Sequence, residues 1–261
     1  MPLTPIQALA LRTIAANRGP DSYLAGATVL HRGPDSPRFS QDLDLFHDLA
    51  DSVALSAETD AATLGDAGFE LTWLLRAPAL FRAVLSREGE QLRVEWAQDS
   101  AFRFFPVEAD DECGYRLHHA DAAVNKMLAL AGRQEVRDYV DILHLHGSYL
   151  HLGALAWAAC GKDPGFTPGF LLEQAGRHTA YSQADVDRLS LREPLDLRSL
   201  KRKWLKALEE ARELVEALPP GEVGMLYLDG ERPVTPDPES TRFEDLVRHE
   251  GSIRGAWPDV G

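Results

Sequence analysis

The run Ser40-Gln41-Asp42-Leu43-Asp44-Leu45-Phe46 alternates acidic and apolar residues from Asp42 onward. Alternation with a period of two is typical of a β-strand that buries one of its faces. In such a strand Asp42 and Asp44 project from one face, while Leu43 and Leu45 project into the core. The run therefore predicts a half-buried strand that presents two carboxylates together.

The elements around this strand predict an α+β arrangement. Apolar residues at helical spacing predict a helix over residues 5–17, with Thr4 as its N-cap, and a second helix over residues 57–67. Glycine and proline predict a loop over residues 33–37. Apolar or alternating runs between turn residues predict three further strands, at residues 69–75, 81–86 and 92–96, and a short apolar piece lies at residues 23–25. We therefore expect a mixed sheet with helices in this part of the chain.

The pattern changes near His119, beyond which helical periodicity prevails. The predicted helices cover residues 120–131, 136–146, 154–159, 170–175 and 199–218. Two prolines and a glycine end the last of them, at residues 219–221. We therefore predict a core of residues 1–115, followed by a mainly helical domain of residues 116–261 with an irregular C-terminal tail.

Charge and cysteine content limit the classes of protein that fit. The 261 residues carry a formal net charge of −14, whereas proteins that bind phosphate backbones non-specifically are usually basic. Bound divalent cations reverse the local field, so an acidic protein can still act on nucleotides. The two cysteines provide neither a disulfide framework nor a zinc-binding spacing, and no apolar run reaches membrane-spanning length. We expect a cytoplasmic protein that does not contact a membrane.

The paired carboxylates suggest a metal site. Two carboxylates held side by side repel each other unless a cation lies between them, and Mg²⁺ favours oxygen ligands of this kind. Glu95 is the expected third ligand, because the apolar residues of its strand alternate with it and occupy the other face; Asp99 is the alternative. An Asp-x-Asp pair is also an ordinary polar face of an edge strand, so the pair alone does not decide the function.

Two blocks of sequence together resemble a known family. The first block combines the small-residue turn Gly26-Ala27-Thr28 with Arg38, Ser40 and the alternating acidic strand. The second block runs from Lys126 to Arg133 and continues through Arg137-Asp138-Tyr139-Val140-Asp141. In this combination the chain resembles the DNA polymerase β-like nucleotidyltransferase superfamily, and within it the AbiEii/AbiGii toxin family. The resemblance covers residues 20–150 or so.

The resemblance implies a polymerase β-like core that transfers a nucleoside monophosphate from an NTP to an RNA or protein acceptor. It implies the toxin of a toxin–antitoxin system, with an antitoxin protein as partner. It implies Mg²⁺ or Mn²⁺ at Asp42, Asp44 and Glu95, which with Asp138 form the expected catalytic set. Asp138 would orient a substrate group or assist proton removal. The residues expected to contact the nucleotide are Gly26, Thr28, Arg38, Ser40, Lys126 and Arg133.

Two alternatives stay open. Ala27 stands where the family has glycine or serine, which leaves room for a relative that binds a nucleotide without turnover. The acidic charge suits a cationic acceptor, which favours a small-molecule nucleotidyltransferase of the antibiotic-modifying kind.

Two further features have ordinary explanations. The basic run Lys201-Arg202-Lys203, with Lys206, is expected to be a solvated helix face, and its functional alternative is a contact for RNA or an acidic partner. The residues His144, His146 and His151 lack a metal-binding spacing, so we expect partly exposed histidines on helices.

Overall fold

The computed structural model describes residues 3–33, 35–133, 135–177 and 180–258, so Pro34 of the predicted loop lies outside the described residues. The chain divides into two compact units. The first comprises residues 1–101 and 106–122, and the second comprises residues 102–105 and 123–261.

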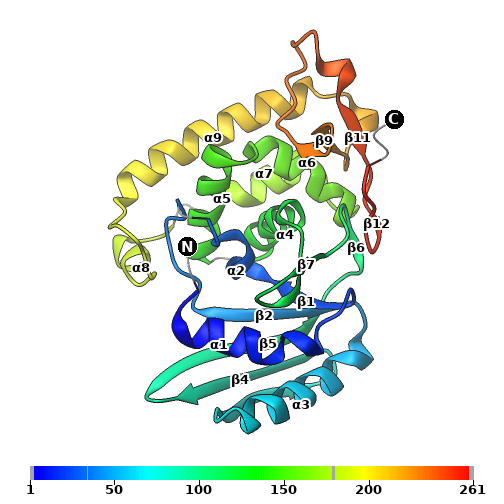
Figure 1. The fold of residues 1–261 in the computed structure, drawn as a ribbon. Coiled ribbons are helices and arrows are strands. Elements are labelled where there is room, and N and C mark those ends of the chain that lie inside the picture. Colours follow the sequence, from blue (N-terminus) through cyan, green and yellow to red (C-terminus); the bar gives the residue numbers. More distant parts are fainter. Residues whose placement is uncertain (1–2, 34, 134, 178–179, 259–261) are drawn as a thin grey trace. The chain divides into compact units, whose positions relative to one another are not determined.

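A seven-stranded mixed sheet forms the centre of the first unit, in the order β3-β4-β5-β2-β1-β8-β7 (Figure 1). Its strands are β1 (Ser22–Ala25), β2 (Asp42–His47), β3 (Glu70–Ala77), β4 (Leu80–Arg87), β5 (Glu90–Gln98), β7 (Glu108–Asp110) and β8 (Gly114–Arg116). The acidic strand β2 pairs in parallel with β5 and antiparallel with β1. It therefore lies inside the sheet, which rules out the simple explanation of an edge strand with a polar face.

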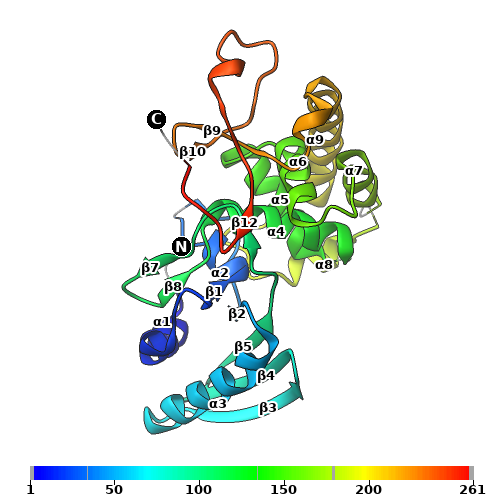
Figure 2. The ribbon, with the colours of Figure 1, turned by 90° about the vertical axis from the view of Figure 1, so that its right-hand side faces the viewer.

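Two helices cover one face of this sheet: α1 (Pro5–Ile14), which the 3-10 turn Ala15–Asn17 extends, and α3 (Ala50–Asp66). Figure 2 shows α3 alongside β3 and β4. Thr4 is the N-cap of α1, as predicted, in a capping box with Gln7. The helix α3 begins seven residues before its predicted start, at Ala50 rather than residue 57. Its periodicity is hidden because Asp60 lies on the buried face while Leu55 is exposed.

Asp60 belongs to a charged network buried beneath α3. Both of its oxygens lie 2.6 Å from the Arg18 guanidinium, and both side chains are inaccessible to solvent. The Trp96 indole donates to Asp60 at 2.7 Å, and Asn17 donates at 2.9 Å. Buried charges are tolerated when they are paired and hydrogen-bonded in this way. The network joins the end of the first helix, α3 and β5.

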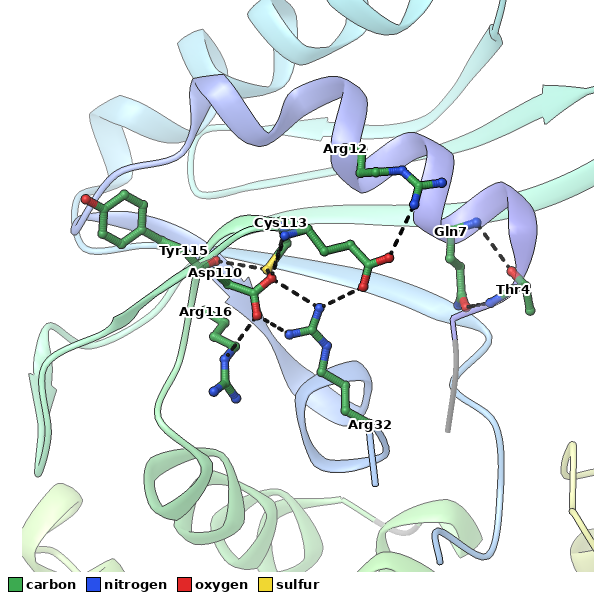
Figure 3. A network of polar contacts seen from close by, with 9 residues as sticks. Thr4, Gln7, Arg12, Arg32, Asp110, Cys113, Tyr115 and Arg116 are labelled. Atoms are coloured by element: carbon green, nitrogen blue, oxygen red, sulfur yellow. Dashed lines mark hydrogen bonds and ion pairs between the residues drawn. The ribbon is translucent and has the colours of Figure 1, made fainter. Parts of the chain in front are cut away.

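A second polar network joins β7 and β8 to the short helix α2 (Gly26–Leu30) (Figure 3). Asp110 forms a bidentate ion pair with Arg32, which lies just beyond α2, and accepts hydrogen bonds from the backbone N–H groups of Glu112 and Cys113. Arg116 of β8 also pairs with Asp110, at 3.3 Å. These strands are three residues long, too short to show alternation, so the sequence did not predict them.

The second unit is mainly helical, and in it the long helix α9 packs against α5, α6 and α7 (Figure 1). Its helices are α4 (His119–Gly132) from Ala123 onward, α5 (Val136–Ser148), α6 (Leu152–Lys162), α7 (Pro168–Gly176), α8 (Gln183–Asp187) and α9 (Leu197–Ala217). The buried side of α9 includes Leu200, Trp204 and Leu208, while Arg202 and Lys203 are exposed, as expected of a solvated basic face.

The chain beyond α9 contains strands, where an irregular tail was predicted. A three-stranded sheet forms in the order β10-β9-β11, from β9 (Leu226–Asp229), β10 (Arg232–Pro233) and β11 (Val247–His249). A separate pair joins β12 (Ser252–Ile253) to β6 (Phe102–Arg103). These strands are recognisable only through tertiary packing, such as the cluster of Trp157, Leu218, Tyr227 and Phe243. Among the described residues no helix is both long enough and apolar enough to span a bilayer.

Candidate functional site

The register of β2 and β5 places the predicted carboxylates side by side. Asp44 is paired with Glu95, and Leu45 is paired with Trp96. Partners in a ladder project from the same face, so Glu95 lies next to Asp44 on the face opposite the buried leucines. The alternative ligand, Asp99, follows the end of β5, where its N–H group donates to the carbonyl of His47. The geometry therefore favours Glu95 as the third carboxylate.

Gly26 lies in direct contact with this face. Its φ of +66° is in the left-handed region, and a Cβ built at this position would lie 1.9 Å from Oδ2 of Asp44. The contact arises because Ala25, the last residue of β1, is paired with Asp44. Any larger residue would collide with the carboxylate, so the small-residue turn and the acidic strand form one structural unit.

Two hydroxyl groups fix the backbone at Asp42. Thr28 Oγ1 donates to the Asp42 carbonyl at 2.8 Å, and Ser40 Oγ donates to the same oxygen at 3.0 Å. The Ser40 carbonyl in turn accepts a hydrogen bond from Gln7 Nε2 at 3.0 Å. Arg38 is buried and donates to the carbonyl of Phe39 at 3.3 Å. The residues predicted from the first block thus converge on the start of β2, where the Thr28 hydroxyl holds the strand.

Two arginines accompany the carboxylates on the same face. Arg82 of β4 pairs with Glu95, with its Nε 2.7 Å from Oε2. Arg93 of β5 approaches Asp42, with 3.9 Å between Nε and Oδ1. Arg82 was not among the residues predicted from the sequence. Its signal is the polar position between buried Phe81 and Ala83 in an alternating strand, but which strand it faces depends on the β4–β5 pairing.

The second predicted block forms a compact cluster of charges within the second unit. Lys126 Nζ lies 2.8 Å from Asp138 and 3.2 Å from Asp141, and Arg133 Nε lies 2.7 Å from Asp138. Burial alone raises the pKa of Asp138, but the charges of Lys126 and Arg133 outweigh burial and hold that pKa below its ordinary value. Asp138 is therefore a weak proton acceptor, and its contacts hold two cationic side chains in place.

The donor set on the sheet face fits a divalent cation of the Mg²⁺ or Mn²⁺ type. Asp42, Asp44 and Glu95 supply carboxylate oxygens from two hydrogen-bonded strands, and hard cations prefer such ligands.

Three side chains of the second unit also come together: His146 of α5, His151 at the N-cap of α6 and Glu210 of α9. The Nε2 atoms of the two histidines lie 3.4 Å and 3.7 Å from Oε2 of Glu210. Each Nδ1 atom accepts a hydrogen bond from a backbone N–H group, of Leu152 and Gly153 respectively. A neutral ring of this tautomer carries its proton on Nε2, where a metal would have to bind. The arrangement therefore favours hydrogen bonding to Glu210 over metal binding.

The chain has the fold of a nucleotidyltransferase, and its mixed sheet carries a glycine turn against carboxylates on adjacent strands. Two solved structures share this fold. JHP933 from Helicobacter pylori matches with a TM-score of 0.53 and 18% identity, over 82% of this chain and 95% of that chain. MenT4, a nucleotidyltransferase toxin from Mycobacterium tuberculosis H37Rv, matches with a TM-score of 0.58 and 18% identity, over 80% of this chain and 82% of that chain.

At this identity the likeness concerns the fold, and the fold expected from the sequence resemblance is confirmed. No protein-family model matches the chain, and no curated protein matches it.

Proposed function

We propose that this protein is a metal-dependent nucleotidyltransferase that transfers a nucleoside monophosphate from an NTP to an acceptor. The observation that carries the proposal is the contact of Gly26 with Asp44, on a face that also presents Asp42 and Glu95. A glycine in this turn lets its backbone approach the three carboxylates closely, so a triphosphate bound to their cations would lie beside the backbone of the turn. The fold shared with a nucleotidyltransferase toxin supports this assignment.

The chemistry is an in-line displacement. An acceptor oxygen attacks the α-phosphorus of the NTP and forms a new O–P bond; the bond from the α-phosphorus to the bridging oxygen breaks, and pyrophosphate leaves. The acceptor proton passes to solvent. A divalent cation held by Asp42, Asp44 and Glu95 would supply neutralisation of the phosphate charge.

The chain's other residues bind and orient the substrate in this proposal. Lys126 and Arg133 contact phosphates as positive charges, and Asp138 positions both of them instead of accepting a proton. Gly26 and the backbone N–H groups of the turn approach the triphosphate. Ser40 and Thr28 support the strand that carries the carboxylates, and Arg38 binds the nucleotide.

We further propose an RNA or protein acceptor and a role as the toxin of a toxin–antitoxin pair, with an antitoxin protein as partner. The support is the resemblance of the two sequence blocks to the AbiEii/AbiGii toxins, together with the fold shared with MenT4.

A label-transfer assay tests the proposal. The protein is incubated with Mg²⁺, an α-³²P-labelled NTP, and RNA or protein fractions as acceptors. Asp42→Asn and Asp44→Asn should each reduce labelling by about 100-fold or more, because each removes a cation ligand. Asp51→Asn, an exposed aspartate in the first turn of α3, is the matched control and should label normally. Full labelling by both site variants would disprove the assignment.

The net charge of −14 favours a second acceptor class, a cationic small molecule. The same assay with an aminoglycoside panel separates the two classes, because label on an aminoglycoside and none on RNA or protein would identify this second class. Ala27 favours a relative without turnover, for which calorimetry would detect NTP binding in Mg²⁺ while every acceptor stays unlabelled.

A further inference from the structure

We propose that Arg82 and Arg93 compete with the divalent cation for the carboxylates of the sheet face, and so set the affinity of the site for that cation. The inference rests on the proposed function, in which Asp42, Asp44 and Glu95 hold the cation.

The first observation is the pairing of Arg82 with Glu95. Two nitrogens of the guanidinium, Nε and a terminal NH2, donate to a single oxygen, Oε2. The two residues are direct partners in the β4–β5 register, and Glu95 is in turn the register partner of Asp44. One row across three strands therefore carries, in order, an arginine and two carboxylates. The backbone fixes this row, so Arg82 cannot be far from the cation that the carboxylates would hold.

The second observation is a neighbouring row on the same face, two residues earlier along β2 and β5. Arg93 is the register partner of Asp42, and its Nε lies 3.9 Å from Oδ1 of that residue. The Arg93 side chain is about half exposed, at 54%, whereas that of Arg82 is at 38%. The ion pair of Arg93 is longer and more exposed to solvent than that of Arg82, so Arg93 should lower the affinity for the cation by less.

Competition follows from charge and from lone pairs. An oxygen that accepts two charged N–H groups directs its lone pairs at the guanidinium, so a cation must share or displace that contact. A cation also meets the repulsion of the fixed positive charge nearby. Without the arginines, the three carboxylates on two adjacent strands would repel one another more strongly. The arginines therefore keep the sheet face stable in the absence of the cation, and they lower its affinity for the cation.

The test measures Mn²⁺ binding directly, through the loss of the free-ion signal in electron paramagnetic resonance, with no NTP present. Arg82→Gln should bind Mn²⁺ more tightly by about five-fold, the effect of removing one positive charge several ångströms from a divalent ion in water. Arg93→Gln should give a smaller gain, and Arg82→Lys should stay close to the wild type because the charge is kept.

The matched control is Arg76→Gln. Arg76 lies on the neighbouring strand β3 and pairs with Glu58 of α3, so its removal changes the net charge equally without touching the carboxylate face. It should leave the Mn²⁺ affinity unchanged. Thermal unfolding of each variant verifies that it is folded; if Arg82→Gln does not fold, Arg93→Gln tests the same competition at Asp42.

Unchanged or weaker Mn²⁺ binding by folded Arg82→Gln would overturn the inference. Gains of equal size in the Arg76 and Arg82 variants would also overturn it, since they would reflect net charge alone. Asp44→Asn separates a failure of the proposed competition from a failure of the proposed cation site. If it abolishes Mn²⁺ binding while Arg82→Gln binds like the wild type, only the competition fails. If it leaves binding intact, the proposed cation site itself is wrong.

Discussion

Replacing Gly26 by alanine should disable the site while leaving most of the fold intact. Two costs arise at this position. A left-handed φ of +66° costs an L-residue about 1–2 kcal/mol. The new Cβ would also lie 1.9 Å from Oδ2 of Asp44, where ordinary contact begins at 3.4 Å, so the carboxylate or the turn must move by 3.4 − 1.9 = 1.5 Å.

This displacement sets the expected functional effect. A misplacement of about 1 Å in a catalytic group reduces the rate by about 100-fold, so label transfer by Gly26→Ala should fall by at least that factor. The free energy of unfolding, from urea titration, should fall by about 1–2 kcal/mol from the backbone cost, and further from the collision.

Gly89→Ala separates these two costs. Gly89 has a φ of +84°, and a Cβ built there has no atom within 4 Å, so this variant carries the backbone cost alone. It should lose stability by about 1–2 kcal/mol and label its acceptor at the wild-type rate. If Gly26→Ala and Gly89→Ala lose the same stability and label equally well, the proposed contact between the glycine turn and Asp44 has no functional role.

Three further outcomes are expected. Asp60→Ala should lower the free energy of unfolding by about 3–5 kcal/mol in urea titrations, because it leaves a buried arginine charge unpaired. The control is Asp66→Ala, at an exposed site on the same helix. A loss in Asp60→Ala no larger than that in Asp66→Ala would contradict the buried network. Burial lowers the pKa of His47 to about 4; protonation therefore favours the unfolded chain, and stability falls as the pH drops from about 6.5 towards 4. From pH 7 to 5 the wild type should lose about 2 kcal/mol more than His47→Gln in urea titrations, and equal losses would show that this histidine titrates normally. Asp138→Asn should slow label transfer at least about 10-fold, because Lys126 would be misplaced, and the shape of the pH–rate profile should stay unchanged. Loss of the acidic limb of that profile would instead identify Asp138 as the proton acceptor.

Elements with strong local periodicity were predictable from the sequence. Strand β2 was predictable because acidic and apolar residues alternate from Asp42 to Leu45, and α1 was predictable because apolar residues recur at helical spacing after its N-cap, Thr4. The start of α3 was not, since a buried Asp60 and an exposed Leu55 invert the usual pattern. Polar residues occupy a helix core only when a partner from elsewhere in the chain meets them, and local sequence does not reveal that partner.

The short strands depended wholly on the rest of the chain. The strands β7 and β8 have three residues each, and Asp110 holds them through Arg32, which lies 78 positions earlier in the sequence. The two-residue strands β6 and β12 pair across an even longer separation. Contacts of this kind carry no local periodicity, which is the signal on which prediction rests.

In the candidate site too, some features follow from local sequence and others from non-local pairing. The sequence by itself determined that Asp42 and Asp44 share a face and that Glu95 occupies the polar face of its own strand, because side chains alternate along any strand. Only the tertiary structure decided that Glu95 stands beside Asp44, and that Gly26 touches it. The physical reason is that register and strand order come from non-local packing: a shift of one residue in the pairing of β2 with β5 would have placed Val94 or Trp96 beside Asp44.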